Sequence, residues 1–192
     1  MDSRLEKGAF RVFNAPMKLP LLFLSAFLCS GICGLHAESF SISRSAYGQT
    51  HDGKRVDLYT MRNQAGLSAS VMTFGATLIS LEAPDRKGTL ENLTLHLDSF
   101  EDYQKGHPLF GSVVGRFANR IEKGILEIDG KRYQLAIGGS GNHIHGGKTG
   151  FQKQVWNAES IRGKEHVGVR LSLTSPDGHE NYPGTLEVTM EY

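Results

Sequence analysis

Cysteine is scarce in this sequence, and both cysteines, Cys29 and Cys33, lie close to the N-terminus. The long segment that follows them can form no disulfide, so its stability must come from a packed apolar core. Charge of one sign is not in excess either, because 21 Lys and Arg residues are balanced by 20 Asp and Glu residues. Nucleic acid requires a clustered basic face, which this balance does not provide, and we expect no nucleic-acid partner.

Long apolar runs are also lacking. The most apolar stretch follows Lys18 and extends loosely over residues 19–32. This is shorter than the roughly 20 residues that a membrane-spanning helix needs, so we expect no stable membrane anchor. A positive charge followed by a short apolar run is instead typical of a secretory signal.

We therefore predict that residues 1–37 are a signal peptide, with small Ala37 as the residue before the cleavage point. The domain would then span residues 38–192 and be exported, either to the periplasm or out of the cell. Residues 1–16 precede a second methionine, Met17, so they are either an extension of the signal or the product of a misplaced start.

No stretch after the signal shows the 3.6-residue apolar period of a long helix. Short segments instead alternate apolar and polar residues, with glycine-containing turns between them. This pattern predicts an all-β protein, for which an antiparallel β-sandwich is the default architecture. The expected strands include residues 67–73, 78–81, 91–99 and 167–174.

One hairpin is predicted in detail, over residues 125–135 (ILEIDGKRYQL). Its centre is Asp129-Gly130, and Asp-Gly is the preferred two-residue turn because both positions need a positive φ. In this register Leu126 faces Tyr133, and Glu127 faces Arg132 as an ion pair. Residues 186–192 (LEVTMEY) still alternate where the sequence stops, so we expect the sandwich to be truncated at its C-terminus.

Two histidines between glycines, in residues 141–147 (GNHIHGG), are the first candidate for chemistry. A phosphate-binding loop is rejected, because five residues separate Gly141 from Gly147 where that motif needs four. On a strand His143 and His145 would share a face, as metal ligands should, but no third ligand is evident and we expect no metal. From the residues alone, a polar loop whose histidine bonds the backbone is favoured.

A set of motifs around this loop resembles the aldose 1-epimerases, the family of galactose mutarotases. The resemblance covers about residues 45–192, and it is specific as a set although each motif alone is weak. The motifs are FGATLISLEAPDR (74–86), VGRFANRI (114–121), DGKRYQL (129–135), NHIHGG (142–147), GFQKQVW (150–156) and SPDGHENYPG (175–184).

The resemblance implies a large antiparallel β-sandwich of the galactose-mutarotase type, often called a supersandwich. It also implies interconversion of the α and β anomers of a hexose, such as glucose or galactose, without a cofactor. A general base takes the proton from the C1 hydroxyl while a general acid protonates the ring oxygen. The family's histidine and glutamate for these roles fall beyond Tyr192, so the resemblance implies no catalytic residue in this chain and no activity of the chain alone.

Three binding positions carry over from the resemblance. Asn119 and Arg120 match the family's Asn-Arg pair, which orients sugar hydroxyls, and the Arg fork presents fixed donors to neighbouring oxygens. His145 matches the histidine that contacts the sugar near the reacting centre. His143 occupies a position that usually holds another residue, and it is treated as a neighbour without a role.

Other residues in the motifs are expected to be structural. Arg116 and Asp177 match motif positions without an assigned site role, and Phe151 and Trp156 are expected in the core rather than as platforms for a sugar. The implied partner is a small hexose, and the protein is expected to be a monomer. Two alternatives stay open: a carbohydrate-binding module that does not react with its ligand, and a structural sandwich domain of a larger carbohydrate enzyme.

Overall fold

The computed structural model describes residues 40–106 and 108–192. The predicted signal peptide, residues 1–37, lies outside the described residues, so its cleavage stays a prediction. Within the described ranges, no helix has the length and apolar character needed to cross a membrane.

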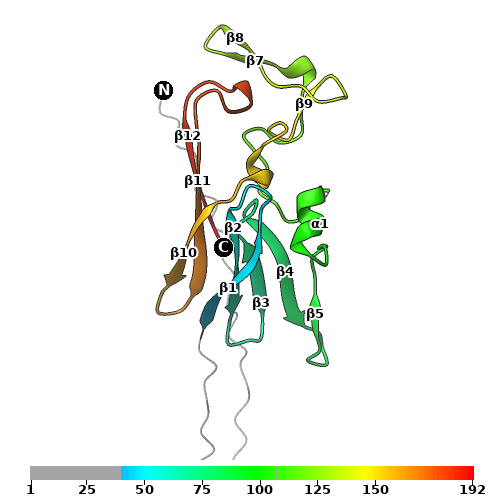
Figure 1. The fold of residues 1–192 in the computed structure, drawn as a ribbon. Helices are drawn as coiled ribbons and strands as arrows, with labels where there is room; N and C mark the ends of the chain where they lie inside the picture. The colour runs from blue at the N-terminus through cyan, green and yellow to red at the C-terminus, as the bar shows by residue number, and fades with distance from the viewer. Residues whose placement is uncertain (1–39, 107) are drawn as a thin grey trace, which may run out of the picture. The chain divides into compact units, whose positions relative to one another are not determined.

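Strands dominate the described part of the chain, as the alternating pattern predicts (Figure 1). The helical segments are short: α1 (Phe100–Lys105) and the 3-10 turns η1 (Glu122–Gly124), η2 (Phe151–Lys153) and η3 (His179–Asn181). The strands are β1 (Ser41–Gln49), β2 (Arg55–Arg62), β3 (Ser68–Met72), β4 (Thr77–Pro84), β5 (Leu90–Asn92), β6 (Arg120–Ile121), β7 (Ile125–Ile128), β8 (Lys131–Gln134), β9 (His143–Ile144), β10 (Asn157–Arg162), β11 (Val167–Ser175) and β12 (Leu186–Glu191).

Two antiparallel sheets form the body of the domain. The first has five strands in the order β1-β2-β3-β4-β5, and the second has three in the order β10-β11-β12. Spatial order follows chain order in both, because tight turns join successive strands. In the turn before β5, for example, the Gly88 N–H donates to the Asp85 carbonyl oxygen at 3.0 Å, and Gly88 supplies the positive φ of 84°.

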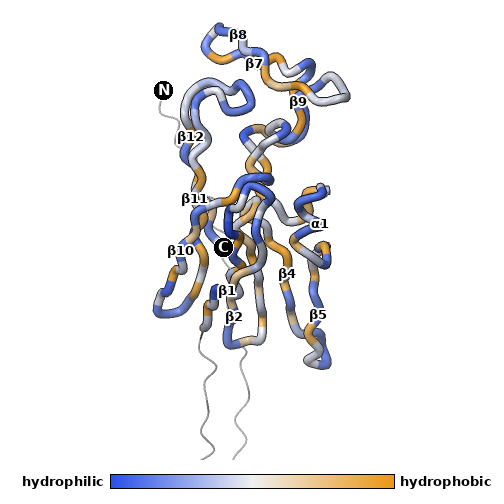
Figure 2. Tube along the Cα trace, in the orientation of Figure 1, coloured by the Kyte–Doolittle hydropathy of each residue, from blue (hydrophilic) through white to orange (hydrophobic). Residues whose placement is uncertain are grey.

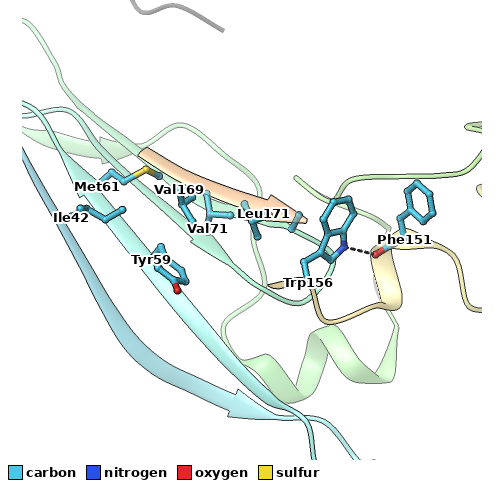
Figure 3. Packing of buried hydrophobic residues seen from close by; sticks show 9 residues of the cluster. Ile42, Tyr59, Met61, Val71, Phe151, Trp156, Val169 and Leu171 are labelled. Atoms are coloured by element: carbon cyan, nitrogen blue, oxygen red, sulfur yellow. Dashed lines mark hydrogen bonds between the residues drawn. The ribbon is translucent and has the colours of Figure 1, made fainter. Parts of the chain in front are cut away.

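The main core lies between one face of β1, β2 and β3 and the facing side of β11. Apolar residues recur along the strands of both sheets (Figure 2), and the buried ones pack together (Figure 3). Hydrogen bonds also join the sheets, since Tyr59 donates to the Ala158 carbonyl oxygen at 3.2 Å and Arg162 to that of Ile42 at 2.9 Å. The antiparallel β-sandwich is confirmed. Its buried cluster comprises Ile42, Tyr59, Met61, Val71, Ala76, Phe151, Trp156, Val169 and Leu171.

Trp156 and Phe151 belong to this core, as expected. Their rings meet edge to face, with centroids 5.9 Å apart, and each side chain is nearly fully buried. The Trp156 indole N–H donates to the Phe151 carbonyl oxygen at 3.1 Å (Figure 3). With its faces and its polar atom all occupied, Trp156 offers no stacking surface to a sugar.

The opposite face of the five-stranded sheet is covered by α1, which the sequence pattern did not predict. Phe100 and Tyr103 of the helix pack on Val56, Met72 and Phe74. A capping residue starts the helix: the Ser99 hydroxyl accepts from the Asp102 N–H at 3.2 Å and donates to the Asp102 carboxylate at 2.7 Å. With one face against the second sheet and the other against α1, the central strands β2 and β3 are largely buried on both sides.

The strand predicted over residues 91–99 is wrong beyond Asn92. The Asn92 side-chain oxygen accepts hydrogen bonds from the Leu81 and Thr94 amides, at 3.0 and 3.1 Å. The side chain thus takes the place of a ladder partner, a competition typical of asparagine. Leu93 and Leu95 are 64% and 68% exposed, so the alternation there does not mark a buried face.

The hairpin of β7 and β8 has the predicted register, with Leu126 opposite Tyr133 and Glu127 opposite Arg132. Asp129 and Gly130 have φ values of 50° and 74°, as the predicted turn requires. The predicted ion pair is wrong, because Glu127 forms no salt bridge with Arg132 in the described part of the chain. Both side chains are exposed, and hydration competes with such a pair.

A buried carboxylate in β2 predicts how stability depends on pH. Asp57 accepts from Arg44 at 2.6 Å and from Arg55 at 2.7 Å. Burial by itself would raise the pKa of Asp57, but the two guanidinium groups outweigh burial and the pKa is lowered. The unfolded-state pKa of an aspartate is about 3.9, and the folded-state pKa of Asp57 lies below it. The ionised carboxylate therefore stabilises the fold above about pH 3.9, and this stabilisation is lost as the pH falls through the folded-state pKa.

We expect Asp57→Asn to lower the free energy of unfolding at pH 7 by about 1 to 2 kcal/mol, since its arginine partners are more than half exposed. The variant should also lose less stability than the wild type between pH 5 and pH 2. Urea denaturation at several pH values measures both effects. The matched control is Asp98→Asn at an exposed position, and identical acid profiles for the two variants would contradict the prediction.

Candidate functional site

A short ladder brings together two loops that lie far apart in the sequence. Strands β6 and β9 pair antiparallel, with Arg120 opposite Ile144 and Ile121 opposite His143. Asn119 therefore comes to lie beside His145. The His145 N–H donates to the Asn119 carbonyl oxygen at 2.9 Å, and the Asn119 N–H donates to His145 Nδ1 at 3.0 Å.

Arg120 joins the same cluster, because its Nη1 donates to Asn119 Oδ1 at 3.0 Å. The structure thus brings together all three residues that were predicted to bind a sugar. Their role in binding stays a prediction, but their proximity agrees with a shared site. Asn119 and Arg120 are exposed, whereas His145 is half-buried.

The backbone at this cluster is held in an unfavourable conformation. Asn119 and His145 both have positive φ, at 63° and 48°. This left-handed region costs a residue with a Cβ on the order of 1 kcal/mol, although asparagine tolerates it comparatively well. The two reciprocal hydrogen bonds stabilise the conformation, and such retained strain is common where side chains must point at a ligand.

His145 is presented as a hydrogen-bond donor. Because its Nδ1 accepts from the Asn119 amide, the proton of the neutral ring must reside on Nε2. Nε2 has no hydrogen-bond partner within the described ranges. The ring thus offers an N–H donor to whatever enters the space beside it.

That space is a hollow of about 710 Å³, within the size range of small-molecule sites. It lies between the β1–β2 turn, α1 and residues 144–155. Its polar lining includes His51, Asp52, His145 and Gln152, while Phe74 and Val155 contribute apolar surface. Asn119 and Arg120 are not part of the lining, so they would contact a ligand only where it extends beyond the hollow toward them.

Asp52 carries the only carboxylate among the described residues that line the hollow. It accepts from the Thr50 hydroxyl at 2.5 Å and forms an ion pair with Lys54 at 2.9 Å. These contacts, that of Thr50 first, lower the pKa of Asp52. A carboxylate whose pKa is lowered is a weak general base.

Gln152 was missed by the sequence analysis. The residue is only 3% exposed, it lines the hollow, and its Oε1 has no hydrogen-bond partner in the described part of the chain. The residue stands between Phe151 and Lys153 in a motif that was interpreted as packing. No local signal in that motif marks it as polar lining.

Arg116 and Asp177 have structural contacts, as expected. Arg116 donates to Ser175 Oγ at 2.9 Å and to the carbonyl oxygens of Ser175, Pro176 and Pro183 at 2.8, 2.9 and 3.0 Å. Burial lowers the pKa of Arg116. Asp177 accepts from the Gly184 N–H at 2.5 Å and closes the turn before β12. Arg116 thus ties the loop before Asn119 to the loop after β11.

The Gly-Lys-Thr sequence at residues 147–149 binds an internal anion. The Glu180 carboxylate accepts from the Thr149 N–H and the Thr149 hydroxyl, both at 2.5 Å. Burial would raise the pKa of Glu180, but these donors outweigh it and the pKa is lowered. The Thr149 amide is therefore occupied by the protein itself, in agreement with rejection of a phosphate loop.

A metal centre has no support in the described part of the chain, where no three His, Cys, Asp or Glu residues are placed to share an ion. The interpretation of His143 and His145 as a ligand pair also fails on burial. His143 is completely buried, and both of its ring nitrogens are hydrogen-bonded within the protein.

Comparison with known proteins shows the family to which the chain belongs. Residues 57–192 match the family model described as aldose 1-epimerase. The chain belongs to the aldose 1-epimerase family. It is 38% identical over 153 residues to the galactose mutarotase of Sus scrofa, which covers 79% of this chain and 43% of that protein. It is 35% identical over 141 residues to the aldose 1-epimerase of Escherichia coli K12, which covers 73% of this chain and 40% of the relative.

A solved aldose 1-epimerase relative shares the fold. The crystal structure of galactose 1-epimerase from Lactobacillus acidophilus superposes with a TM-score of 0.71 at 34% identity, over 80% of this chain and 44% of that chain. This chain therefore spans less than half the length of the aldose 1-epimerase relatives that it matches.

Proposed function

We propose that this chain is the sugar-binding N-terminal part of an exported aldose 1-epimerase, and that it binds an aldohexose at His145, Asn119 and Arg120. The observation that carries the proposal is the cluster itself. Three polar side chains from two loops are held together by reciprocal hydrogen bonds beside a hollow of about 710 Å³. Membership of the family supports a sugar as the ligand.

The binding chemistry follows from the donors that the cluster presents. A pyranose offers hydroxyl oxygens and a ring oxygen that accept hydrogen bonds, and His145 supplies the Nε2 donor beside them. The Arg120 guanidinium is exposed and donates one hydrogen bond to Asn119, so its other N–H groups are available for vicinal hydroxyls of the sugar. Because an aldohexose carries no charge, its binding does not require a charged surface on the protein.

Ring opening requires more than this cluster contains. A base must remove the C1 hydroxyl proton while an acid protonates the ring oxygen, and the two groups must be fixed on opposite sides of the sugar. His145 is one such group. Asp52 is a weak base for the reason given above, and the His51 ring forms no hydrogen bond in the described part of the chain that would fix its orientation.

We therefore propose that the chain binds the sugar without catalysing its mutarotation. In the relatives, the proton-transfer residues would lie C-terminal to the segment that this chain matches, after the position that corresponds to Tyr192. Binding without reaction is also what a carbohydrate-binding module does. The two functions differ in whether a complementary C-terminal part restores turnover.

Replacing His145 with alanine tests the placement of the sugar. Loss of one donor to a sugar oxygen should weaken binding of D-galactose or D-glucose by about 1 to 1.5 kcal/mol, roughly tenfold. Titration calorimetry or NMR shift titration measures the affinity. The matched control is His166→Ala, at an exposed position in the β10–β11 turn. If both variants bind as tightly as the wild type, the sugar does not lie at His145.

A further inference from the structure

His143 and Tyr182 form a buried pair, and neither is among the residues proposed to contact the sugar. His143 has no exposed surface and Tyr182 is also buried, and the two rings meet edge to face at 5.2 Å. The Tyr182 oxygen lies 2.7 Å from His143 Nε2, and His143 Nδ1 lies 2.7 Å from the Ala136 carbonyl oxygen. Every polar atom of the imidazole is therefore engaged.

The direction of these hydrogen bonds follows from elementary chemistry. The Ala136 carbonyl oxygen can only accept, so His143 Nδ1 carries the proton and donates. Nε2 of the neutral ring is then an acceptor, and the Tyr182 hydroxyl donates to it. Hydrogen bonds therefore run in one direction from Tyr182 through His143 to Ala136. The Arg116 guanidinium lies over the Tyr182 ring, 5.4 Å from its centroid.

Both loops of the candidate site are attached to this chain of bonds. Arg116, whose guanidinium lies over the Tyr182 ring, precedes Asn119 by three residues, and His143 precedes His145 by two residues. Between these points β6 and β9 pair over only two positions. Such a short ladder has little stability of its own, so a bond that joins the segments outside it can determine how closely Asn119 and His145 approach.

We propose that His143 and Tyr182 are positioning residues, which hold the Asn119 and His145 loops at the separation that the Asn119 N–H to His145 Nδ1 hydrogen bond requires. The value of this positioning for ligand binding rests on the proposed function. The positioning itself is a property of the free protein. Burial raises the pKa of Tyr182 to about 12, so its hydroxyl keeps the proton that it donates throughout the physiological pH range.

The test compares Tyr182→Phe and His143→Leu with His143→Gln in the full chain, without sugar. Phenylalanine removes only the hydroxyl, leucine removes both imidazole contacts, and glutamine retains one donor and one acceptor. Tyr133→Phe, on the β7–β8 hairpin, is the control. Amide hydrogen exchange is read at Asn119, and at Val71 in β3 as a measure of global stability.

Exchange at Asn119 should accelerate at least tenfold more than exchange at Val71 in Tyr182→Phe and His143→Leu. The exchange rate at Asn119 should be close to the wild-type rate in His143→Gln and equal to it in Tyr133→Phe. The 15N shift of His145 Nδ1 should move in the same order. Equal acceleration at Asn119 and Val71 would show a structural role alone and overturn the proposal.

Two further measurements keep the outcome decisive. In the wild type, 15N spectra of His143 should show Nδ1 protonated and Nε2 as an acceptor, and the opposite tautomer would overturn the proposal even if no variant folds. Sugar affinity should be about tenfold lower than that of the wild type in Tyr182→Phe, and it should be close to that of the wild type in His143→Gln. If the wild type binds no sugar, the proposed function fails, while the exchange data still decide whether His143 and Tyr182 position the loops.

Discussion

Replacing Gly146 with alanine is expected to reduce sugar affinity by about tenfold or more and to destabilise the fold by about 2 to 4 kcal/mol. Gly146 has a φ of 81°, which costs an alanine on the order of 1 kcal/mol. A Cβ at this position would also overlap the carbonyl group of Gly115. Since both colliding groups are attached directly to backbone, no side-chain rotation relieves the overlap, and overpacking of this kind costs about 1 to 3 kcal/mol more.

The overlap would act directly on the site, because Gly146 follows His145 and Gly115 precedes Arg116. Moving these segments apart should break the hydrogen bond between the Asn119 N–H and His145 Nδ1. Gly141→Ala is a matched control: its φ is 76°, but an added Cβ would meet nothing within 4 Å. Calorimetric titration and urea denaturation of both variants measure the difference. If Gly146→Ala and Gly141→Ala have the same sugar affinity and the same free energy of unfolding, Gly146 does not lie close to the Gly115 carbonyl group.

Replacing Trp156 with alanine is expected to lower the free energy of unfolding by about 3 to 5 kcal/mol. Trp156 is 2% exposed and packs edge to face on Phe151 between the two sheets. Its indole N–H also donates to the Phe151 carbonyl oxygen at 3.1 Å, a bond that alanine cannot make. The loss is a large share of the 5 to 15 kcal/mol that stabilises an ordinary domain.

Urea denaturation followed by circular dichroism measures this change without relying on the lost indole fluorescence. Leu95→Ala is the control at an apolar residue that is 68% exposed, and it should change stability by no more than about 0.5 kcal/mol. Trp156→Phe should be intermediate, because it keeps an aromatic ring but loses the indole hydrogen bond to Phe151. A loss below about 1 kcal/mol for Trp156→Ala would argue against its place in the core.

Local patterns predicted the fold where local chemistry controls it. The β7–β8 hairpin is an example, because Asp129 and Gly130 suit a turn that itself sets the strand register. The pattern failed after Asn92, where alternation continues but a side chain competes for the backbone bonds. It also missed α1, although Ser99 and Asp102 at capping positions are a recognisable signal before so short a helix.

The candidate site shows a different limit. Asn119, Arg120 and His145 were predicted as binding residues because they belong to motifs, and the structure places them in contact. Tyr182 and Glu180 were missed because their partners, His143 and Thr149, lie more than 30 residues away in sequence. No periodicity or spacing encodes such contacts. They arise only when the loop after β11 packs on the loops of the site.

The central proposal is that this chain binds a sugar at Asn119, Arg120 and His145 but does not by itself supply the acid and base that open the ring. Its sharpest consequence concerns a freshly dissolved anomer, whose optical rotation drifts spontaneously toward equilibrium. A protein that binds the sugar without an opposed acid and base leaves the barrier to ring opening in place. A C-terminal part that supplies them should restore turnover.

Polarimetry of fresh α-D-glucose or α-D-galactose with the purified chain measures this directly. We expect the rotation to relax at the spontaneous rate, with or without His145→Ala, and to accelerate when a C-terminal part of a family member is supplied. Relaxation well above the spontaneous rate with the chain alone, abolished by His145→Ala, would show that the chain contains a complete catalytic pair and would contradict the claim.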